Sequence, residues 1–313
     1  MAASAALLVA AGWALARMTQ EQEVVRIAAA AAKVPAKPPD SSPVTVRDPA
    51  VPNGLVHGAC VAFRPTGVDR RQTVFLDPGH GGPDPGALGI RSDRSVVAEK
   101  DLTLALALQL RDQLRTDGFR VVLSRTADTA VAVLSDAQIR DGAITNAGSH
   151  VDGVARVACA NAAAADVLVS LHFDAFSDPT VGGAETFYDD ARDFAAANQR
   201  LATLLQTGMI SSFRSHRWQT DDRGVISDAL TGTSGNSEAA DRYGRLLILG
   251  PAKTGWLDVP SRMPGALVEP LFITDPREAD AAWTSDGRKV IADGLEKGIT
   301  AYLAPPPASP PNT

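Results

Sequence analysis

The chain has 313 residues, which is enough for one sizeable core or two small domains. Hydrophobic residues make up 45% of the sequence and charged residues 21%, so the body is expected to fold as a globular protein. The net charge of −6 argues against a nucleic-acid partner, because phosphate binding needs a clustered basic surface.

The N-terminal segment, residues 1–20, bears on where the protein acts. It is apolar and alanine-rich, and Ala14 to Ala16 has the small-x-small pattern of a signal-peptidase site, although neither Lys nor Arg precedes the run. The run is shorter than the roughly 20 residues that a membrane span needs. We expect this segment to be a signal peptide. The alternatives, in decreasing order of preference, are a short signal anchor and a misassigned start codon, and a cytosolic helix is the remaining possibility. Export would place the protein in the periplasm or cell envelope, or outside the cell.

Proline spacing sets the other boundaries of the chain. Residues 21–53 are expected to be a linker, in which residues 21–33 could form a short helix and residues 34–53 carry prolines at a density that favours an extended chain. Residues 304–313 form a second proline-rich stretch that is expected to be a disordered tail. The folded body therefore runs over residues 54–303 and is a single domain by size.

Within the body, short apolar runs alternate with helical apolar stripes. Strands are predicted at Val74–Leu76, Arg120–Ser124, Val167–Leu171, Gly183–Tyr188, Leu246–Leu249 and Ala266–Val268. Helices are predicted at Ala98–Asp117, Arg156–Ala165, Asp193–Phe213 and Ala282–Leu303. The alternation predicts an α/β fold with a mostly parallel, twisted sheet sandwiched by helices.

Two regions lack such a pattern. Residues 129–155 are punctuated by glycines and predict a long loop or a partly ordered insertion, in which His150 is expected to be an unliganded surface residue. Residues 215–244 form a second long irregular region.

Cys60 and Cys159 are the only thiols; they would form a disulfide worth roughly 2–4 kcal/mol if the body is exported, and two independent buried thiols are the alternative.

Three residues at the ends of predicted elements form a candidate metal set. His80 stands on a Gly/Pro-rich turn after the first strand, His172 follows the strand Val167–Leu171, and Glu99 opens the leucine-striped helix. Active sites of α/β folds form at the carboxyl edge of the sheet, where these residues would converge. Two imidazoles and one carboxylate are a catalytic zinc set that leaves a position for water.

Each of these residues also has a purely structural interpretation. Glu99 could be a first-turn carboxylate that the helix dipole favours, His172 a core histidine bonded to a carbonyl, and His80 an incidental turn residue. A fourth candidate is Glu269, which interrupts the apolar run from Ala266 to Ile273. Because an unpaired buried carboxylate is costly, Glu269 either pairs structurally or acts as a general acid/base.

Several motifs in order resemble a known family, the zinc-dependent N-acetylmuramoyl-L-alanine amidases of the Amidase_3 type. The motifs are Leu76 to Ala87 (LDPGHGGPDPGA), Glu99 to Asp101, Ser124 to Asp128, Arg156 to Asn161, Ser170 to His172 and Leu267 to Glu269. The resemblance covers about Thr73 to Leu303. It implies a sheet sandwiched by helices, a Zn²⁺ ion bound by His80, Glu99 and His172, and Glu269 as the catalytic acid/base.

The sequence departs from the family pattern at two places near these residues. Asp174 stands where the family usually has Asn, and Pro270 follows Glu269 where the family commonly continues differently. The site is therefore expected to be more acidic than usual, with a different backbone beside Glu269.

The resemblance implies a cell-wall hydrolase that cleaves the amide between the lactyl group of MurNAc and L-Ala in peptidoglycan. The expected protein is secreted or tethered at its N-terminus, monomeric, and takes peptidoglycan or muropeptides as its substrate. Two alternatives are a non-catalytic peptidoglycan-binding regulator on the same fold and another zinc amidohydrolase; fold alone does not separate them.

Overall fold

A computed structural model of the chain describes residues 44–45, 51, 54–233 and 243–305. The expected signal segment at 1–20, most of the expected linker and residues 306–313 of the tail lie outside the described residues. In the part that is described, none of the helices is long and apolar enough to cross a membrane.

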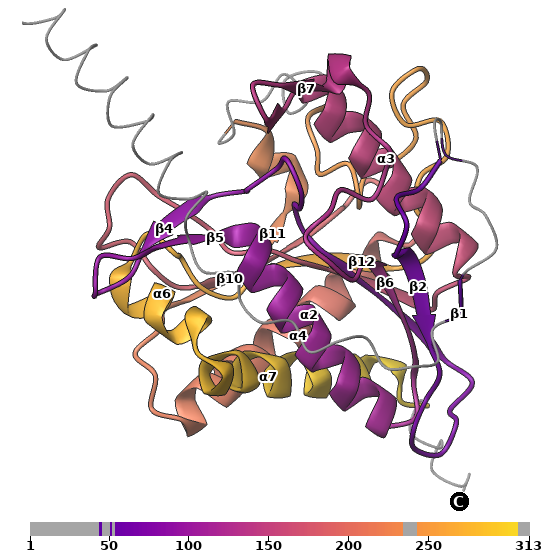
Figure 1. Cartoon of the computed structure of the whole chain (residues 1–313). Coiled ribbons are helices and arrows are strands. Elements are labelled where there is room, and N and C mark those ends of the chain that lie inside the picture. The colour runs from indigo at the N-terminus through magenta and orange to yellow at the C-terminus, as the bar shows by residue number, and fades with distance from the viewer. Residues whose placement is uncertain (1–43, 46–50, 52–53, 234–242, 306–313) are drawn as a thin grey trace, which may run out of the picture.

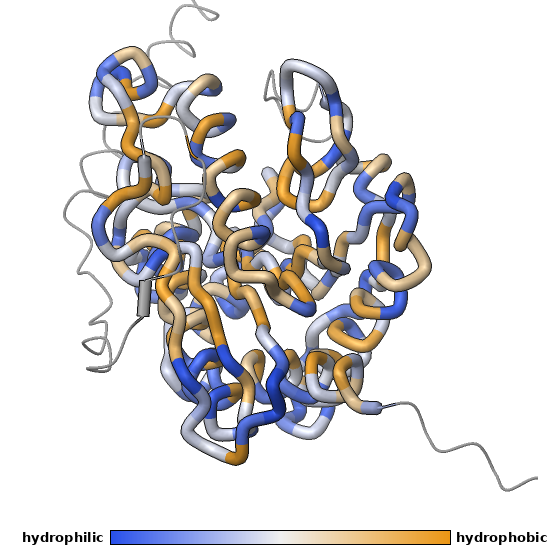
Figure 2. The backbone as a smooth tube through the Cα atoms, turned by 90° about the vertical axis from the view of Figure 1, so that its right-hand side faces the viewer, coloured by the Kyte–Doolittle hydropathy of each residue, from blue (hydrophilic) through white to orange (hydrophobic). Residues whose placement is uncertain are grey.

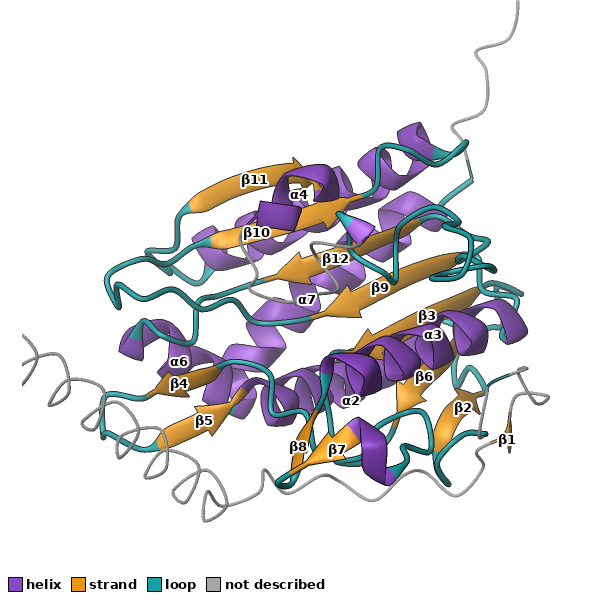
Figure 3. Cartoon of the chain, turned by 90° about the horizontal axis from the view of Figure 1, so that it is seen from above, coloured by secondary structure: helices purple, strands orange, loops and turns teal. Residues whose placement is uncertain are grey.

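An eight-stranded mixed sheet lies at the centre of the domain (Figure 3). In spatial order its strands are β1 (Val44–Thr45), β2 (Ala59–Phe63), β6 (Arg120–Arg125), β3 (Thr73–Pro78), β9 (Val167–Leu171), β12 (Gly265–Glu269), β10 (Ala184–Tyr188) and β11 (Asp222–Ser227). Four of the seven neighbouring pairs are parallel, including all pairs among β6, β3, β9 and β12. The predicted α/β fold with a mostly parallel sheet is confirmed.

Helices cover both faces of the sheet (Figure 1). The helices α2 (Glu99–Thr116), α4 (Ala195–Ser215) and α7 (Ser285–Leu303) lie on one face, and α3 (Asn146–Ala162) lies on the other. The remaining elements are the short helix α6 (Pro276–Trp283), the 3-10 turns η1 (Asp136–Gln138) and η2 (Asp228–Thr233), and two hairpins, β4–β5 (Leu88–Ile90 and Val96–Ala98) and β7–β8 (Ile139–Arg140 and Ala143–Ile144).

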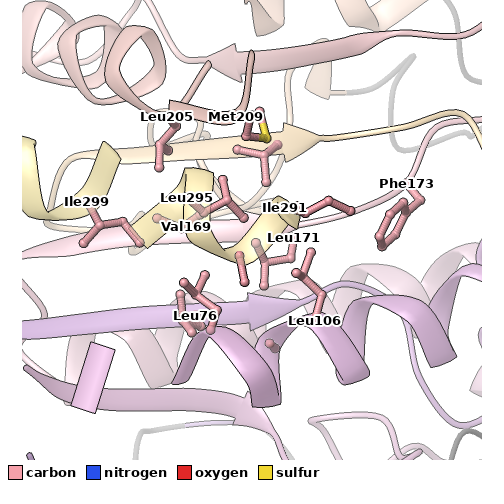
Figure 4. Close-up of a cluster of buried hydrophobic side chains, with 14 of the residues drawn as sticks. Leu76, Leu106, Val169, Leu171, Phe173, Leu205, Met209, Ile291, Leu295 and Ile299 are labelled. Atoms are coloured by element: carbon pink, nitrogen blue, oxygen red, sulfur yellow. The ribbon is translucent and has the colours of Figure 1, made fainter. Parts of the chain in front are cut away.

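Alternation along the strands divides the core into two layers. Leu76 and Val169 face the α2, α4 and α7 side, whereas Phe75 and Leu168 face α3, because successive side chains of a strand point to opposite faces. Figure 4 shows the first layer, in which strand residues meet Leu106 of α2 and side chains of α4 and α7. In Figure 2 the hydrophobic stretches follow these strands and helices. Both faces of the sheet are therefore buried, and its carboxyl edge is left to hold polar groups.

The structure corrects the prediction of a long loop over residues 129–155. That region holds η1, the β7–β8 hairpin and the first half of α3, whose N-cap Thr145 accepts a hydrogen bond from Gly148 N at 3.2 Å. Of the glycines that predicted a loop, Gly148 reflects close packing instead, because a Cβ there would lie 2.4 Å from the carbonyl oxygen of Gln138. His150 is a helical residue that bonds Trp256 O at 2.7 Å rather than a flexible-loop residue.

Three further predictions of local structure were wrong. Leu246–Leu249 is a turn, not a strand, and it closes through hydrogen bonds from Leu249 N and Gly250 N to Leu246 O. The single helix predicted at Ala282–Leu303 is divided between α6 and α7, because Thr284 is extended and caps α7 by accepting from Gly287 N at 3.0 Å. The irregular region predicted at 215–244 contains β11 and η2.

Cys60 and Cys159 form a disulfide, so the alternative of two free thiols is excluded. The bond joins β2 to α3 across a sequence separation of 99 residues, and both residues are fully buried. It ties the N-terminal strand of the domain to the helix that covers one face of the sheet.

Removing this crosslink should destabilise the fold. For the double variant Cys60→Ala with Cys159→Ala, we expect the free energy of unfolding to fall by about 2–4 kcal/mol, because a long loop in the unfolded chain is no longer closed. Urea denaturation measures the change, and a reductant should lower the stability of the wild type but not of the variant. Two thiols that react with an alkylating reagent in native, unreduced protein would contradict the crosslink.

Candidate metal centre

Three of the residues expected from the sequence meet at the carboxyl edge of the sheet. His80 follows β3, His172 follows β9 and Glu99 is the first residue of α2. Glu99 lies between the two rings, with its Oε1 2.9 Å from His172 Nδ1 and its Oε2 3.1 Å from His80 Nε2. The ligand atoms of the three side chains lie within 4.8 Å of one another, and among the described residues this is the one such group of three or more His, Cys, Asp or Glu side chains.

Glu99 is held by the backbone as well as by the histidines. It is buried, and its carboxylate accepts hydrogen bonds from Ala87 N at 2.8 Å and Phe173 N at 3.1 Å. Burial alone would raise its pKa, but the charges and hydrogen bonds of His80 and His172 outweigh burial and lower the pKa. The helix N-terminus also favours a carboxylate here. Glu99 is therefore an ionised group enclosed by donors, not an exposed first-turn charge.

His80 stands in a strained backbone conformation beside two acids. Its φ is 61°, in the left-handed region that residues other than glycine seldom adopt, and such positions cluster at functional sites. Its Nδ1 lies 2.9 Å from Asp84 Oδ2, so its other ring nitrogen is turned toward Glu99. Burial would lower the pKa of His80, but Glu99 and Asp84 raise it to about 10. The surroundings favour positive charge at this point, as a cation site does.

Glycines allow the cluster to pack closely. A Cβ at Gly79 would lie 2.3 Å from His172 Cε1, and one at Gly86, whose φ is +66°, would lie 2.6 Å from Glu99 Oε2. The glycines of the LDPGHGGPDPGA segment therefore keep side chains out of the space that the candidate ligands occupy.

Two buried arginines fix the loop that carries His80. Arg156 donates to Pro78 O at 2.8 Å and to His80 O at 2.6 Å. Arg125 donates to Pro78 O at 3.0 Å and to Gly79 O at 2.9 Å. Three successive carbonyl groups thus accept hydrogen bonds from guanidinium groups. These bonds replace the ladder hydrogen bonds that the chain can no longer make after β3.

Arg156 is in turn held by buried acids. Its Nη1 lies 2.7 Å from Asp77 Oδ1 and its Nε lies 2.8 Å from Asp152 Oδ2. Burial would raise the pKa of Asp77, but the charge of Arg156 and hydrogen bonds, including one from Ser124, hold it below its ordinary value. Ser170 Oγ donates to the other carboxylate oxygen of Asp77 at 2.9 Å. The network connects β3, β6, β9 and α3 directly beneath the histidines.

A cleft opens beside the histidines on the α3 side of the sheet. It has a volume of about 190 Å³ and lies between α3 and the turn at residues 246–248, with His80 and His172 in its lining. A Cβ at Gly153 of α3 would be 3.1 Å from Leu247 Cδ2, so this glycine sets the distance between helix and turn. One wall of the cleft therefore comes from the region predicted to be a loop, residues 129–155, and the other from the segment predicted to be a strand, Leu246–Leu249.

Glu269 ends β12, the strand next to β9. Its Oε2 is buried and has no hydrogen-bond partner among the described residues. Burial, and then the neighbouring carboxylates Glu99, Asp174 and Glu185, raise its pKa well above the ordinary value. A buried carboxyl group with a raised pKa and a free oxygen is suited to carrying a proton.

Asp174 and Pro270, the two departures from the family pattern, lie close to Glu269. Burial and a hydrogen bond with Glu185 raise the pKa of Asp174 to about 7. Pro270 does not interrupt the pairing between the segment that follows β9 and the segment that follows β12. Asp174 N donates to Leu271 O at 3.0 Å, and Ile273 N donates to Asp174 O at 2.8 Å. Asp174 brings a further carboxyl group to this edge, and the strand pairing continues past the proline.

The structure places all four candidate residues at one edge of the sheet, with His80, Glu99 and His172 in contact and Glu269 on the adjoining strand. The residues that support them have no role predicted from the sequence. Arg125 and Arg156 stood inside two of the quoted motifs, and charged residues in or beside apolar segments are the signal that could have identified them. Asp84, four residues after His80, is within the first motif.

A His–Glu–His group beside a buried carboxyl group is typical of metal-dependent hydrolases. The model of the N-acetylmuramoyl-L-alanine amidase family matches residues 74–301, and the chain belongs to this family.

Individual relatives agree with the family match. The amidase AmiA of Salmonella typhimurium is 28% identical over 74% of this chain and 76% of its own length. The germination-specific N-acetylmuramoyl-L-alanine amidase of Bacillus subtilis is 28% identical over 74% of this chain and 79% of its own length. The crystal structure of an N-acetylmuramoyl-L-alanine amidase from Clostridium difficile 630 superposes with a TM-score of 0.51 at 28% identity, covering 74% of this chain and 96% of that one.

The buried arginine network should be essential for stability. We expect Arg156→Ala to lower the free energy of unfolding by about 3–5 kcal/mol, because Asp77 and Asp152 would remain buried without their charge partner. Arg277→Ala is the control, since Arg277 is exposed and also pairs with an aspartate, and its stability should stay near that of the wild type. Equal stability of the two variants in urea denaturation would contradict the assigned role of Arg156.

Proposed function

We propose that this family member is a zinc-dependent amidase that cleaves the amide between the lactyl group of MurNAc and L-Ala in peptidoglycan, with zinc held by His80, Glu99 and His172 and with Glu269 as the catalytic acid/base. The observation that carries the proposal is the His–Glu–His cluster next to a glutamate whose buried Oε2 lacks a partner among the described residues. Family membership and the similarity to amidases support the reaction.

The residues fit a zinc ion. Two imidazole nitrogens and a carboxylate are the donor set of catalytic zinc sites, and the three groups are already close together. The carboxylate of Asp84 at His80 Nδ1 is the kind of outer partner that orients a ligating histidine. A bound zinc ion would supply Lewis acidity that polarises the scissile carbonyl and makes water more acidic.

Glu269 supplies the proton transfers. Its free oxygen accepts a proton from the attacking water and returns it to the amine nitrogen of L-Ala as the amide breaks. The carboxylates around Glu269 raise its pKa, and positive charge entering the His–Glu–His cluster lowers it again toward the working range. The cleft between α3 and residues 246–248 gives the substrate access to the same edge.

The cellular setting follows from the substrate. Peptidoglycan lies outside the cytoplasmic membrane, so we place the protein in the cell envelope or outside the cell, and the Cys60–Cys159 disulfide is consistent with an oxidising compartment. The N-terminal signal or tether and the monomeric state remain predictions from the sequence.

Digestion of purified muropeptides followed by mass spectrometry tests the reaction. Release of peptides that begin with L-Ala is the expected result. Absence of any product from zinc-loaded protein would favour a non-catalytic binding module, and cleavage at another bond would favour a different amidohydrolase.

Glu269 should be required for turnover but not for metal binding. We expect Glu269→Gln to keep one zinc per chain and to lower kcat by about 10²–10⁴-fold, the range for loss of a positioned acid/base. Glu296→Gln is a matched control, because Glu296 is a partly buried glutamate of α7 whose pKa is also raised, to about 7, away from this edge. Turnover at the wild-type rate in the Glu269 variant would refute the assignment.

Asp84 should strengthen zinc binding through His80. For Asp84→Ala we expect zinc affinity to fall by about 10–100-fold in a chelator competition assay, because His80 loses the partner that orients its ring. Asp178→Ala, which removes an exposed aspartate, should leave the affinity unchanged. An unchanged affinity in the Asp84 variant would show that the histidine is oriented without it.

A further inference from the structure

The edge strand β11 contains an irregularity that points an arginine toward the site. Ala184 of β10 pairs with Asp222, but the next residue, Glu185, pairs with Gly224, so Arg223 is an extra residue without a partner in the ladder. Gly224 has a φ of +87°, which permits this bulge. Bulges are uncommon in parallel pairs, and they recur beside active sites, where they redirect a side chain. Arg223 is such a side chain.

The surrounding residues form a seat for the arginine. A Cβ at Gly183 would lie 2.7 Å from Arg223 Cδ, so the absence of a side chain there makes room for the aliphatic stem. The guanidinium carbon lies 4.9 Å from the centre of the Phe272 ring, within the range of a cation–π contact. Arg223 Nε donates to Glu185 Oε2 at 2.6 Å. A bulge, a glycine, an aromatic ring and a buried acid therefore fix one guanidinium group.

Glu185 connects this guanidinium group to the proposed acid/base. Glu185 and Glu269 are directly opposite each other on β10 and β12, a pairing that puts their Cβ atoms about 5 Å apart. Glu185 is buried, whereas 40% of the Arg223 side chain is exposed. Within the described part of the chain, neither Nη1 nor Nη2 of Arg223 has a hydrogen-bond acceptor. The outer fork of Arg223, formed by Nη1 and Nη2, is thus available to a ligand.

We propose that Arg223 binds a carboxylate of the substrate peptide, namely that of the acidic residue that follows L-Ala in the peptidoglycan stem. The inference rests on the proposed function, in which Glu269 protonates the leaving amine, because that places the released peptide on the β12, β10 and β11 side. Arginine forks bind carboxylates through paired hydrogen bonds. An extended peptide advances about 3.3–3.6 Å per residue, so the residue after L-Ala reaches a group one side chain beyond Glu269.

The acids already present do not occupy this fork. Glu185 uses Nε only, and Asp174 shares a hydrogen bond with Glu185 rather than with Arg223. Glu185 holds the guanidinium group at Nε, and the outer edge of the group is left to the substrate. Arg223 is accordingly a specificity-determining residue for an acidic stem peptide, not a catalytic residue.

A pair of substrates isolates this contact. Both are N-acetylmuramoyl tripeptides with an amidated C-terminus, and they differ only in whether the α-carboxyl group of the second residue is free or amidated. We expect the wild type to prefer the free carboxylate, and Arg223→Gln to reduce kcat/KM on that substrate by about 10–100-fold, mainly through KM, while the amidated substrate changes little. Arg223→Lys, which keeps the charge without the fork, should lose part of the preference.

The ratio of the two kcat/KM values within each variant removes any effect of partial unfolding. Arg277→Gln is the matched control and should leave the ratio at the wild-type value, because this exposed arginine pairs with Asp275 instead. An equal loss on both substrates, or an unchanged ratio in Arg223→Gln and Arg223→Lys, would overturn the proposal.

Binding of the released peptides separates this proposal from the proposed function. Calorimetry with the zinc-loaded wild type should show tighter binding of the free-carboxylate tripeptide than of its amide, and Arg223→Gln should abolish the difference. Carboxylate-dependent binding without turnover would support the role of Arg223 and contradict the amidase assignment. Equal binding of both peptides to the wild type would contradict the role of Arg223.

Discussion

The site depends on hydrogen bonds to three backbone carbonyl groups in the turn that carries His80. Pro78, Gly79 and His80 leave the β-ladder at the edge of the sheet, and Arg125 and Arg156 donate to their oxygens. An unsatisfied buried carbonyl group would be costly, so the two guanidinium groups make the turn possible. Arg156 belongs to α3, and the disulfide at Cys159, one turn further along the same helix, anchors α3 to β2. The position of a candidate ligand is therefore linked to the packing of a whole face of the sheet.

The strand order arranges the chemistry along one edge. From the centre outward, β3 precedes His80, β9 precedes His172, β12 ends at Glu269 and β10 carries Glu185. The edge strand β11 adds Arg223 through its bulge. The candidate histidine ligands, the proposed acid/base and the proposed peptide-binding group thus follow or belong to neighbouring strands, although they are far apart in the sequence.

Much of this could be predicted from the sequence, and the failures have physical reasons. The candidate ligands His80, Glu99 and His172 could be identified because a break in apolar periodicity indicates the end of a strand or helix. The first half of α3 was missed because Gly148 resembles a loop signal, whereas it is required by the close approach of Gln138. The apolar run at Leu246 resembles a strand because burial alone does not distinguish a packed turn from a ladder. Pairs of residues that are distant in the sequence, such as Arg223 and Glu185, have no local sequence pattern that would identify them.

The cluster of carboxyl groups in the site explains why it needs positive charge nearby. Glu99, Asp174, Glu185 and Glu269 converge on one edge, and carboxylates so close together cannot all ionise without compensating positive charge. Two of them show the consequence, since the pKa of Asp174 is raised to about 7 and that of Glu269 is raised well above its ordinary value. Arg223 offsets this charge on the β11 side, and the histidine cluster offers a place for a cation on the β3 side. Asp174 adds to the demand for positive charge, so this chain should depend on both positive groups more strongly than a variant that has asparagine at that position.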